Sequence, residues 1–468
     1  MNFPGWFRRR TPAWGLLLAV LAGCATYTMK AIGVRDPLLR GDLPAAHSFL
    51  TKEKPGGDGL PYLFELGLVL RTLGRFDESN AVFQRAEDRI DDLLTKSLSR
   101  EVLSLATSDE TLHYAGEIWE QVLLHHYRAM NYVDLLRFDD AIVECRKASH
   151  RLAVYADAQS NPHTYRDDAF MQYETAILYE AAGELNDAWV SLRLAEEAYE
   201  RYLASYGIAA PSWLARDLMR VAAALGYDRE LEKLRSRYPG TELVEVEELL
   251  RAGEIVLFWE EGFLPAKIQE EVHLPVYKND GDEEDREKFA RILAHRRGQT
   301  KIPHGKKLDY FLRVALPAYL PQAPNHASSR AVLSAAGRFA TTEVAEDLDA
   351  IARAGLTDRM PTILFRAVLR AIGKYGITRA VEEERGEIAG LFANLLTAAT
   401  EKADTRSWIT LPRTIQMARL VVEPGTHDIL LECRGPHGQV TESVQFEGVE
   451  VGAGEIRVLS HRTFFGAR

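Results

Sequence analysis

The feature that most constrains this chain is a pattern of residues that occurs three times in its first half. In each copy a small residue is followed by a large residue, a turn residue, and then large, small, large and small residues at one common spacing. Small residues at fixed places let two helices approach closely, while the larger ones fill the space between them. The three copies are Gly67, Leu70, Gly74, Phe76, Ser79, Phe83 and Ala86; Ala129, Tyr132, Leu136, Phe138, Ala141, Cys145 and Ala148; and Ala176, Tyr179, Gly183, Leu185, Ala188, Leu192 and Ala195.

This spacing resembles the tetratricopeptide repeat, a helix-turn-helix unit of about 34 residues. Residues 224–240 resemble a degenerate fourth unit that Pro239 and Gly240 close. Extra sequence separates the copies, so they are not in strict tandem, and a helical bundle with coincidental spacing is the alternative. We expect a tetratricopeptide-like α-solenoid over residues 58–240. Such a solenoid offers a concave binding surface but does not identify its ligand.

The resemblance also implies which side chains line the groove of the solenoid. In the repeat family these are positions of the first helix that face away from the partner helix. Their aromatic, aliphatic and charged character suits a peptide or a partner helix, although an additional segment that packs into the groove would suit them equally. Carried onto this sequence, the positions are Phe64, Leu68, Arg71, His126, Met130, Asp134, Tyr173, Ile177 and Glu180.

Beyond Gly240 the pattern changes, and residues 241–404 form a mixed region. The apolar run at 254–259 and the alternating residues after it predict a β-hairpin, and residues 310–320 predict a further strand. Two helices are expected between residues 342 and 400, the second beginning at Pro361 and ending at Gly376. Ion pairs between these helices are expected from Glu346, Asp347, Asp349, Arg366 and Arg370.

Residues 405–468 contain short apolar runs divided by Pro-Gly and Gly-Pro pairs, beginning with SWITLP at 407–412. This pattern is typical of a small antiparallel β-sheet or sandwich, and the strand near Ile255 is expected to join it, because a lone hairpin is only marginally stable. The predicted fold is therefore mainly α with a β part: a tetratricopeptide-like α-solenoid, then an α+β region that ends in a small antiparallel module.

The amino-terminal residues predict where the protein is located. Three arginines at 8–10 precede a short apolar stretch, which ends at Leu21-Ala22-Gly23-Cys24. The tetrapeptide resembles the lipobox of bacterial lipoproteins. This implies a signal peptide over 1–23, cleavage between Gly23 and Cys24, lipidation of Cys24, and a linker over 24–57. The resemblance further implies the outer membrane and a body facing the periplasm, because no Asp follows Cys24. An ordinary secretory signal with an incidental cysteine is the alternative.

Several longer stretches resemble an uncharacterised family of bacterial lipoproteins with tetratricopeptide repeats. They are YAGEIWEQVLLHHYRAMNY, AIVECRKA, TTEVAEDLDAIARAGLTDRMPTILFRAVLRAIGKY and ADTRSWITLP. The family brings no assigned activity with it.

Chemistry is not evident from the residues. The net charge of −11 argues against a nucleic-acid binder, and the chain lacks a nucleophile elbow, a zinc-protease motif, a phosphate loop and a dinucleotide fingerprint. Cys145 and Cys433 are expected as buried small hydrophobes, with a disulfide as the alternative, and they offer too few ligands for a metal. No catalytic residue, metal or cofactor is therefore predicted.

These observations predict a non-enzymatic protein-interaction scaffold, held on a membrane through its lipid anchor in the bacterial cell envelope. Its partner would be an envelope protein or peptide, with peptidoglycan as a further option. One alternative is a module that binds wall or surface polysaccharide through aromatics such as Trp408 and Phe446. A cell-wall hydrolase without a sequence motif is the other, because two catalytic carboxylates need no fixed spacing in sequence.

Overall fold

The computed structural model describes residues 27–55, 57, 59–97, 114–158, 165–241, 251–277, 308–321, 329–385, 402–435 and 437–464. The predicted signal peptide and Cys24 lie outside these residues. Among the described helices, none combines the length and the apolar character that crossing a membrane requires.

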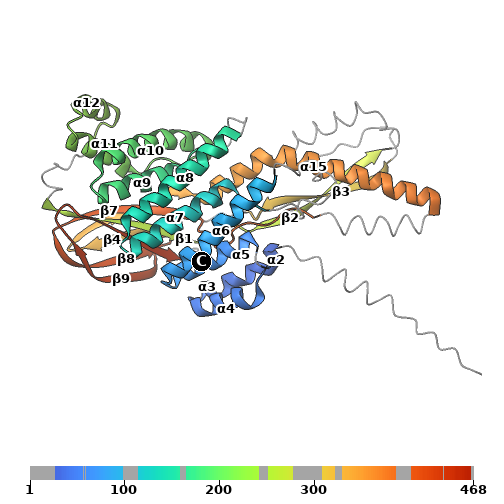
Figure 1. Ribbon diagram of the computed structural model, residues 1–468, viewed down its shortest axis with the longest axis horizontal. Helices are drawn as coiled ribbons and strands as arrows, with labels where there is room; N and C mark the ends of the chain where they lie inside the picture. The colour runs from blue at the N-terminus through green and yellow to red at the C-terminus, as the bar shows by residue number, and fades with distance from the viewer. Residues whose placement is uncertain are drawn as a thin grey trace, which may run out of the picture.

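The first half of the molecule is a row of antiparallel helical hairpins, which confirms the predicted tetratricopeptide-like solenoid (Figure 1). Short helices precede the row, so the segment expected to be a linker is largely helical. These are α2 (Tyr27–Ala31), η1 (Ile32–Val34), α3 (Arg35–Leu39) and α4 (Leu43–Glu53). The hairpins are α5 (Leu60–Thr72) with α6 (Phe76–Ser97), α7 (Ile118–Asp134) with α8 (Phe138–Ala158), α9 (Ala169–Ala181) with α10 (Leu185–Tyr206), and α11 (Ser212–Ala224) with α12 (Asp228–Arg237).

The repeated spacing has a direct structural cause. The turn position has a left-handed backbone in all four hairpins, with φ of +73° at Gly74, +79° at Gly183 and +69° at Gly226, and 58° at Leu136. The small residue at the start of the pattern marks the contact between helices. A Cβ added to Gly67 would lie 2.5 Å from the Phe83 ring, so only glycine fits there without a shift.

The described residues of the second half form three sheets. A four-stranded inner sheet has the order β10-β1-β7-β6, a four-stranded outer sheet has the order β5-β4-β8-β9, and β2 pairs with β3 alone. The strands are β1 (Gly253–Glu261), β2 (Lys267–Tyr277), β3 (Leu308–Tyr319), β4 (Arg330–Ala335), β5 (Arg338–Thr341), β6 (Glu343–Asp347), β7 (Thr414–Val422), β8 (Gly425–Arg434), β9 (Val440–Val451) and β10 (Ile456–Thr463).

The inner sheet lies between the helices and the outer sheet. Val256 and Phe258 of β1 belong to the large core shared with the solenoid, whereas Leu257 and Trp259 belong to a second core between the two sheets. Both faces of β1 are thus covered, which explains why its sequence is continuously apolar rather than alternating. The expected β part is confirmed as two packed sheets, and the strand near Ile255 joins the inner one. That sheet is mixed rather than antiparallel throughout, because β1 pairs in parallel with β10 and antiparallel with β7.

Four local expectations are wrong. β1 and β2 do not form a hairpin, because β1 pairs with β10 and β7 while β2 pairs with β3. The run at 407–412 is a turn segment, not a strand. Residues 343–347 pair with β7 as β6 instead of starting a helix. One helix, α15 (Leu348–Arg385), then continues through an exposed Pro361, and Gly376 lies inside it.

The sequence predicts ion pairs between two helices, but among the described residues one helix, α15, covers both segments. Asp349 pairs with Arg353 one turn further along α15, at 2.6 Å. Glu346 instead accepts a hydrogen bond from Tyr202 of the solenoid at 3.5 Å.

Two helical glycines should respond oppositely to alanine. Gly67→Ala should lower the free energy of unfolding by about 1–3 kcal/mol, because the new methyl group overlaps the Phe83 ring. Gly355→Ala should raise it by about 0.5–1 kcal/mol, because nothing lies within 4 Å of its added Cβ and alanine favours helix. Urea denaturation measures both, and Phe83→Leu should reduce the cost of Gly67→Ala. Equal effects of the two substitutions would contradict the close helix contact.

Candidate functional site: the concave face of the solenoid

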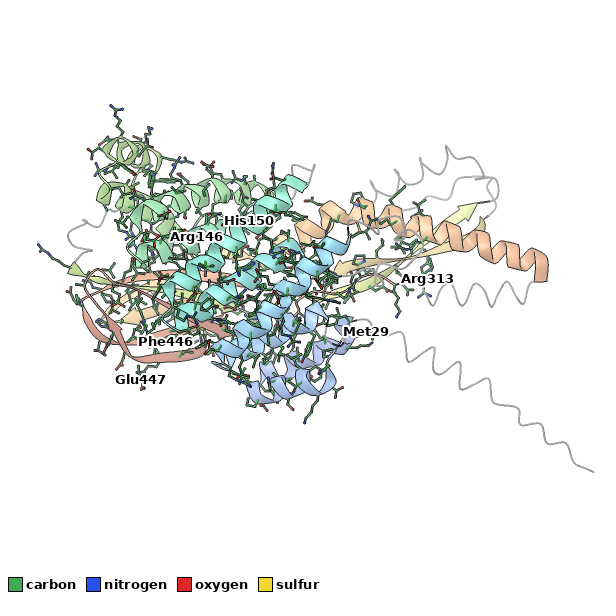
Figure 2. The ribbon with its side chains drawn as sticks, in the orientation of Figure 1. Met29, Arg146, His150, Arg313, Phe446 and Glu447 are labelled. Carbon is green, nitrogen blue, oxygen red and sulfur yellow. The ribbon has the colours of Figure 1, made fainter. Side chains whose placement is uncertain are left out.

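The concave face of the solenoid is covered by the chain itself. Strands β10 and β6 contact α7 and α9, and the segment 405–413 lies against α5 and α7. Eight of the nine predicted groove residues are buried, and Asp134 lies at the rim. Buried side chains of the helices and of the inner sheet form one core, whereas Arg146 and His150 lie on the exposed side of α8 (Figure 2). The alternative in which an additional segment packs into the groove therefore describes this structure, and an open peptide groove does not.

At the first hairpin the groove holds Trp408. Its ring stacks on Phe64 with centroids 4.5 Å apart, and its backbone N–H donates to Glu120 Oε1 at 2.7 Å. Glu65 accepts the next two backbone N–H groups, from Ile409 at 2.8 Å and from Thr410 at 3.1 Å. Two buried carboxylates thus replace the hydrogen bonds that this irregular segment would otherwise make to water.

The N-terminal helices also hold this segment through hydrogen bonds. Arg35 donates from Nε to the carbonyl of Ile409 at 2.9 Å and from Nη2 to the carbonyl of Leu264 at 2.6 Å. Thr28 Oγ1 donates to the carbonyl of Thr405 at 2.7 Å. Residues 27–53 are therefore part of the folded body, contrary to the expectation of a linker.

The middle of the groove holds strand β10. Arg71 donates to Asn131 Oδ1 at 2.8 Å, to Asp134 Oδ2 at 2.9 Å and to Ser460 Oγ at 2.9 Å. His126 Nδ1 lies 2.8 Å from Glu174 Oε2 within the solenoid. The apolar groove residues Leu68, Met130 and Ile177 belong to the shared core.

The far end of the groove contains a buried ionic network. Arg419 of β7 has no exposed side-chain surface, and it meets Asp217 of α11 at 2.5 Å, Glu254 of β1 at 3.5 Å and Glu180 of α9 at 3.6 Å. Tyr173 donates a hydrogen bond to Asp217, and Arg220 pairs with Glu180. The charged groove residues are thus neutralised within the chain.

Burial and the neighbouring charges shift the pKa values of these carboxyl groups in opposite directions. Burial raises the pKa of Glu65 to about 7, against the hydrogen bonds from Thr410 and Ile409. Burial, followed by the charge of Glu117, raises the pKa of Glu120 to about 7. For Asp217 burial also acts upward, but Arg419 and the arginines around it hold the pKa below its ordinary value. Asp217 is therefore ionised at neutral pH, whereas the two acids beside Trp408 titrate near neutrality.

The aromatic residues proposed for sugar binding do not form an open platform. Trp408 is fully buried, and Phe446 is half-buried against the core between the two sheets. Stacking on a polysaccharide requires an accessible ring face, so Trp408 is not such a residue in this structure.

Sequence reasoning missed the residues that hold the groove closed, notably Glu65, Asp217 and Arg419. A signal was present for each of them. Glu65 stands in the apolar stretch LPYLFELGLVL, and Asp217 stands in WLARDLMRV. An acid at a core position of a helix requires a buried partner, and Arg419, inside an apolar strand, is the matching observation.

Comparisons with known proteins add little to this geometry. No family model matches the chain, and no curated protein matches it in sequence. Among solved structures, MamA residues 41 to the end from Desulfovibrio magneticus RS-1 is similar to this chain. The alignment covers 46% of this chain and 94% of the MamA chain, with 10% sequence identity and a TM-score of 0.29.

Two further solved structures are similar over the same fraction of the chain. For the kinesin light chain TPR-like repeats from Podosopora anserina, the alignment covers 44% of this chain and 90% of theirs, with 16% sequence identity and a TM-score of 0.29. For a tetratricopeptide repeat protein from Parabacteroides merdae, the alignment covers 48% of this chain and 84% of that protein, with 14% sequence identity and a TM-score of 0.21. Scores this low carry no argument about function.

The raised pKa of Glu65 predicts a pH-dependent stability. The folded-state pKa, about 7, exceeds the ordinary value of 4.5, so this contribution to stability is complete below about 4.5 and is lost as pH rises through 7. Glu65→Gln loses one hydrogen bond at every pH but does not titrate. The difference in unfolding free energy between wild type and Glu65→Gln should therefore change by up to about 3 kcal/mol between pH 5 and 8.

Urea denaturation across that pH range measures the effect. The matched control is Glu78→Gln on the exposed side of the same hairpin, where the free energy difference should stay constant over this range. A Glu65→Gln difference that is equally independent of pH would contradict the assignment.

Breaking the buried ionic network should be costly. Arg419→Met leaves Asp217 and Glu254 buried without this cation, so the free energy of unfolding should fall by about 3–5 kcal/mol. Arg75→Met removes an exposed pair with Glu78 and should change it by less than about 0.5 kcal/mol. Denaturation followed by tryptophan fluorescence compares the two, and equal losses would show that the network does not hold the sheet to the solenoid.

Proposed function

We propose that this chain is a lipoprotein of the bacterial cell envelope, held at the outer membrane through Cys24 and facing the periplasm, and that it acts as a non-enzymatic scaffold for protein partners. The observation that supports the scaffold is the stack of helical hairpins, whose outer face carries exposed apolar side chains. The anchor rests on the lipobox-like sequence at Leu21–Cys24 and on the absence of Asp after it.

The position of Tyr27, the first residue that the structure describes, supports an anchor that keeps the body near the membrane. Tyr27 is buried in the core, and it follows Cys24 by only three residues, which span at most ~11 Å. Met29 is 68% exposed beside exposed Lys30 on the same short helix. An apolar side chain next to a cation suits the surface of an anionic membrane.

The surface that the repeats leave for a partner is their outer face, because the concave face is filled. Val143 and Val154 of α8 are 45% and 56% exposed, and their spacing places them on one side of the helix with Arg146 and His150 between them (Figure 2). On α10, Val190 is 56% exposed. Apolar residues interleaved with cationic or titratable ones favour a protein partner over a free polysaccharide.

Removing the anchor thiol tests the location. Cys24→Ala should abolish incorporation of a palmitate analogue and release the protein from the membrane fraction, because the thiol is the acylated atom. Cys145→Ala is the matched control, since Cys145 is a buried thiol within α8, and it should keep full labelling. Equal labelling of wild type and Cys24→Ala would remove the anchor from the proposal.

Photo-crosslinking in cells tests the scaffold. A crosslinking residue at Val143 or Val190 should give discrete protein adducts of the same mass, because both positions lie on the proposed outer surface. Val440, which is 48% exposed on β9, is the control position and should not give these adducts. Identical adducts from all three positions, or none from Val143 and Val190, would contradict an outer binding face.

A further inference from the structure

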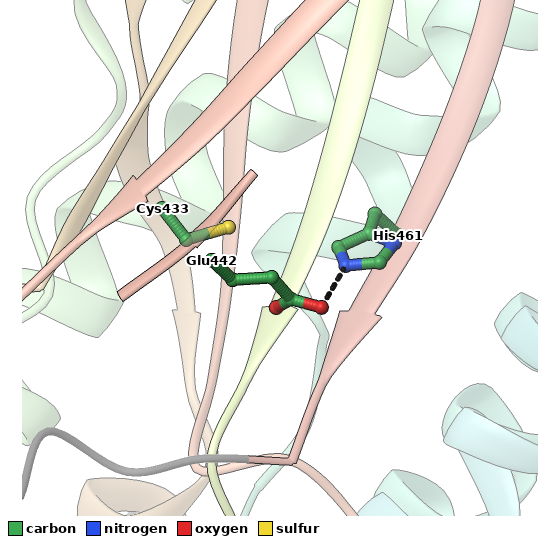
Figure 3. A group of neighbouring side chains, drawn as sticks. All are labelled: Cys433, Glu442 and His461. Atoms are coloured by element: carbon green, nitrogen blue, oxygen red, sulfur yellow. Dashed lines mark ion pairs between the residues drawn. The ribbon is translucent and has the colours of Figure 1, made fainter. Parts of the chain in front are cut away.

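Cys433, Glu442 and His461 converge at one place between the two sheets (Figure 3). Cys433 of β8 and Glu442 of β9 are cross-strand neighbours in the outer sheet, and His461 lies on β10 of the inner sheet. One ligand atom from each, the thiol sulfur, a carboxylate oxygen and a ring nitrogen, lies within 4.8 Å of the others. From this geometry we propose that these three side chains bind one zinc ion and leave its fourth coordination position open.

The donor set matches the chemistry of zinc. Sulfur, imidazole nitrogen and carboxylate oxygen are its three common protein ligands, at about 2.0–2.3 Å, so tetrahedral ligands stand ~3.3–3.8 Å apart. His461 Nε2 lies 3.3 Å from Glu442 Oε1, already at this separation. The contact lacks hydrogen-bond geometry, and Nε2 is a buried atom without a hydrogen-bond partner in the described structure. A cation between the two side chains gives that atom a partner.

The surroundings orient the carboxylate as a second shell would. Thr463 follows His461 by two residues on the same face of β10, and its hydroxyl donates to Glu442 Oε2 at 2.6 Å. Trp259 Nε1 donates to that hydroxyl at 2.9 Å. Glu442 Oε2 is thus held by the protein, which leaves Oε1 to face His461.

Charge and exposure distinguish this group from an ordinary ion pair. A thiolate, a carboxylate and a neutral imidazole together carry two negative charges. The two positive charges of a zinc ion neutralise them. Among the described residues, Glu442 pairs with His461 and with no lysine or arginine. Zinc binds the thiolate form of cysteine, so binding releases the proton of the Cys433 thiol. Cys433 is fully buried, whereas the side chains of Glu442 and His461 are 25% and 19% exposed. An ion could therefore enter the site from the side of Glu442 and His461.

A second group of similar composition serves as the internal comparison. Glu87, His125 and Glu144 also place their ligand atoms together between α6, α7 and α8. Both carboxylates there already pair with Arg128, at 2.5 Å and 3.1 Å, and both lie 3.3 Å from Lys147. Two cations already neutralise these acids, so this group has no need of a metal.

Metal binding by the full chain tests the proposal, in a Cys24→Ala background so that the Cys24 thiol does not contribute. After removal of metals and addition of zinc, the protein should bind one ion per chain and release about one proton from the Cys433 thiol. Cobalt in place of zinc should produce a thiolate-to-cobalt charge-transfer band. Zinc should also raise the unfolding temperature, because it binds only the folded pair of sheets.

Four variants separate this site from others. Cys433→Ser should lose the cobalt band and stoichiometric zinc binding, and Thr463→Val should weaken zinc affinity by ~10–100-fold because Glu442 loses its orienting hydrogen bond. Cys145→Ser and His125→Gln, at the other thiol and the other group, should bind as the parent does. The proposal is overturned if the parent chain binds no zinc, or if Cys433→Ser binds it unchanged.

Discussion

The structure depends on one buried guanidinium. Arg419 lies in the middle of an otherwise apolar strand, and its only favourable position is against carboxylates that are buried with it. Asp217 and Glu180 supply these from two helices of the solenoid, and Glu254 supplies another from the neighbouring strand. A one-residue slip of β7 would place Arg419 in the apolar core between the sheets. The ion pairs therefore set both the register of the inner sheet and the face that it turns to the solenoid.

The position of the inner sheet changes which face of the repeats is available to a ligand. In a solenoid with an open groove, the inner face of the first helices is the ligand surface. Here that face holds β10, β7 and the segment around Trp408, whose backbone N–H groups are accepted by Glu65 and Glu120. The repeats pack around the chain's own sheet. Their outer face is then left for the proposed protein partner, and the proposed zinc site lies between the two sheets.

The two proposed sites lie on different layers and rest on different physics. The outer face of α8 and α10 is defined by exposed apolar side chains, which favour a protein partner. The group of Cys433, Glu442 and His461 is defined by three donor atoms that converge from three strands. Zinc at that position would join the β8–β9 hairpin to β10, and so it would couple the outer sheet to the sheet that the solenoid holds.

Most of the secondary structure could be predicted from local patterns. The spacing of Gly67, Gly74 and Phe83 reports contacts within one hairpin, and such contacts recur wherever the spacing recurs. The strands after residue 414 could be placed for a similar reason, because turn residues divide them. Pro361 shows the limit of this reasoning, since a proline that usually starts a helix lies inside α15, where its exposed position tolerates the lost hydrogen bond.

The sequence by itself determined the hairpin repeats, the strand near Ile255 and the strands after residue 414, because each is specified by neighbours a few positions apart. Only the tertiary structure decided that the groove is filled, that Trp408 is buried on Phe64, and that Cys433 has Glu442 and His461 beside it. These outcomes depend on which distant segments pair, and parallel pairing of β1 with β10 joins residues about 200 positions apart. Local periodicity carries no information about such pairing, whereas the burial of charged side chains such as Arg419 and Asp217 selects it.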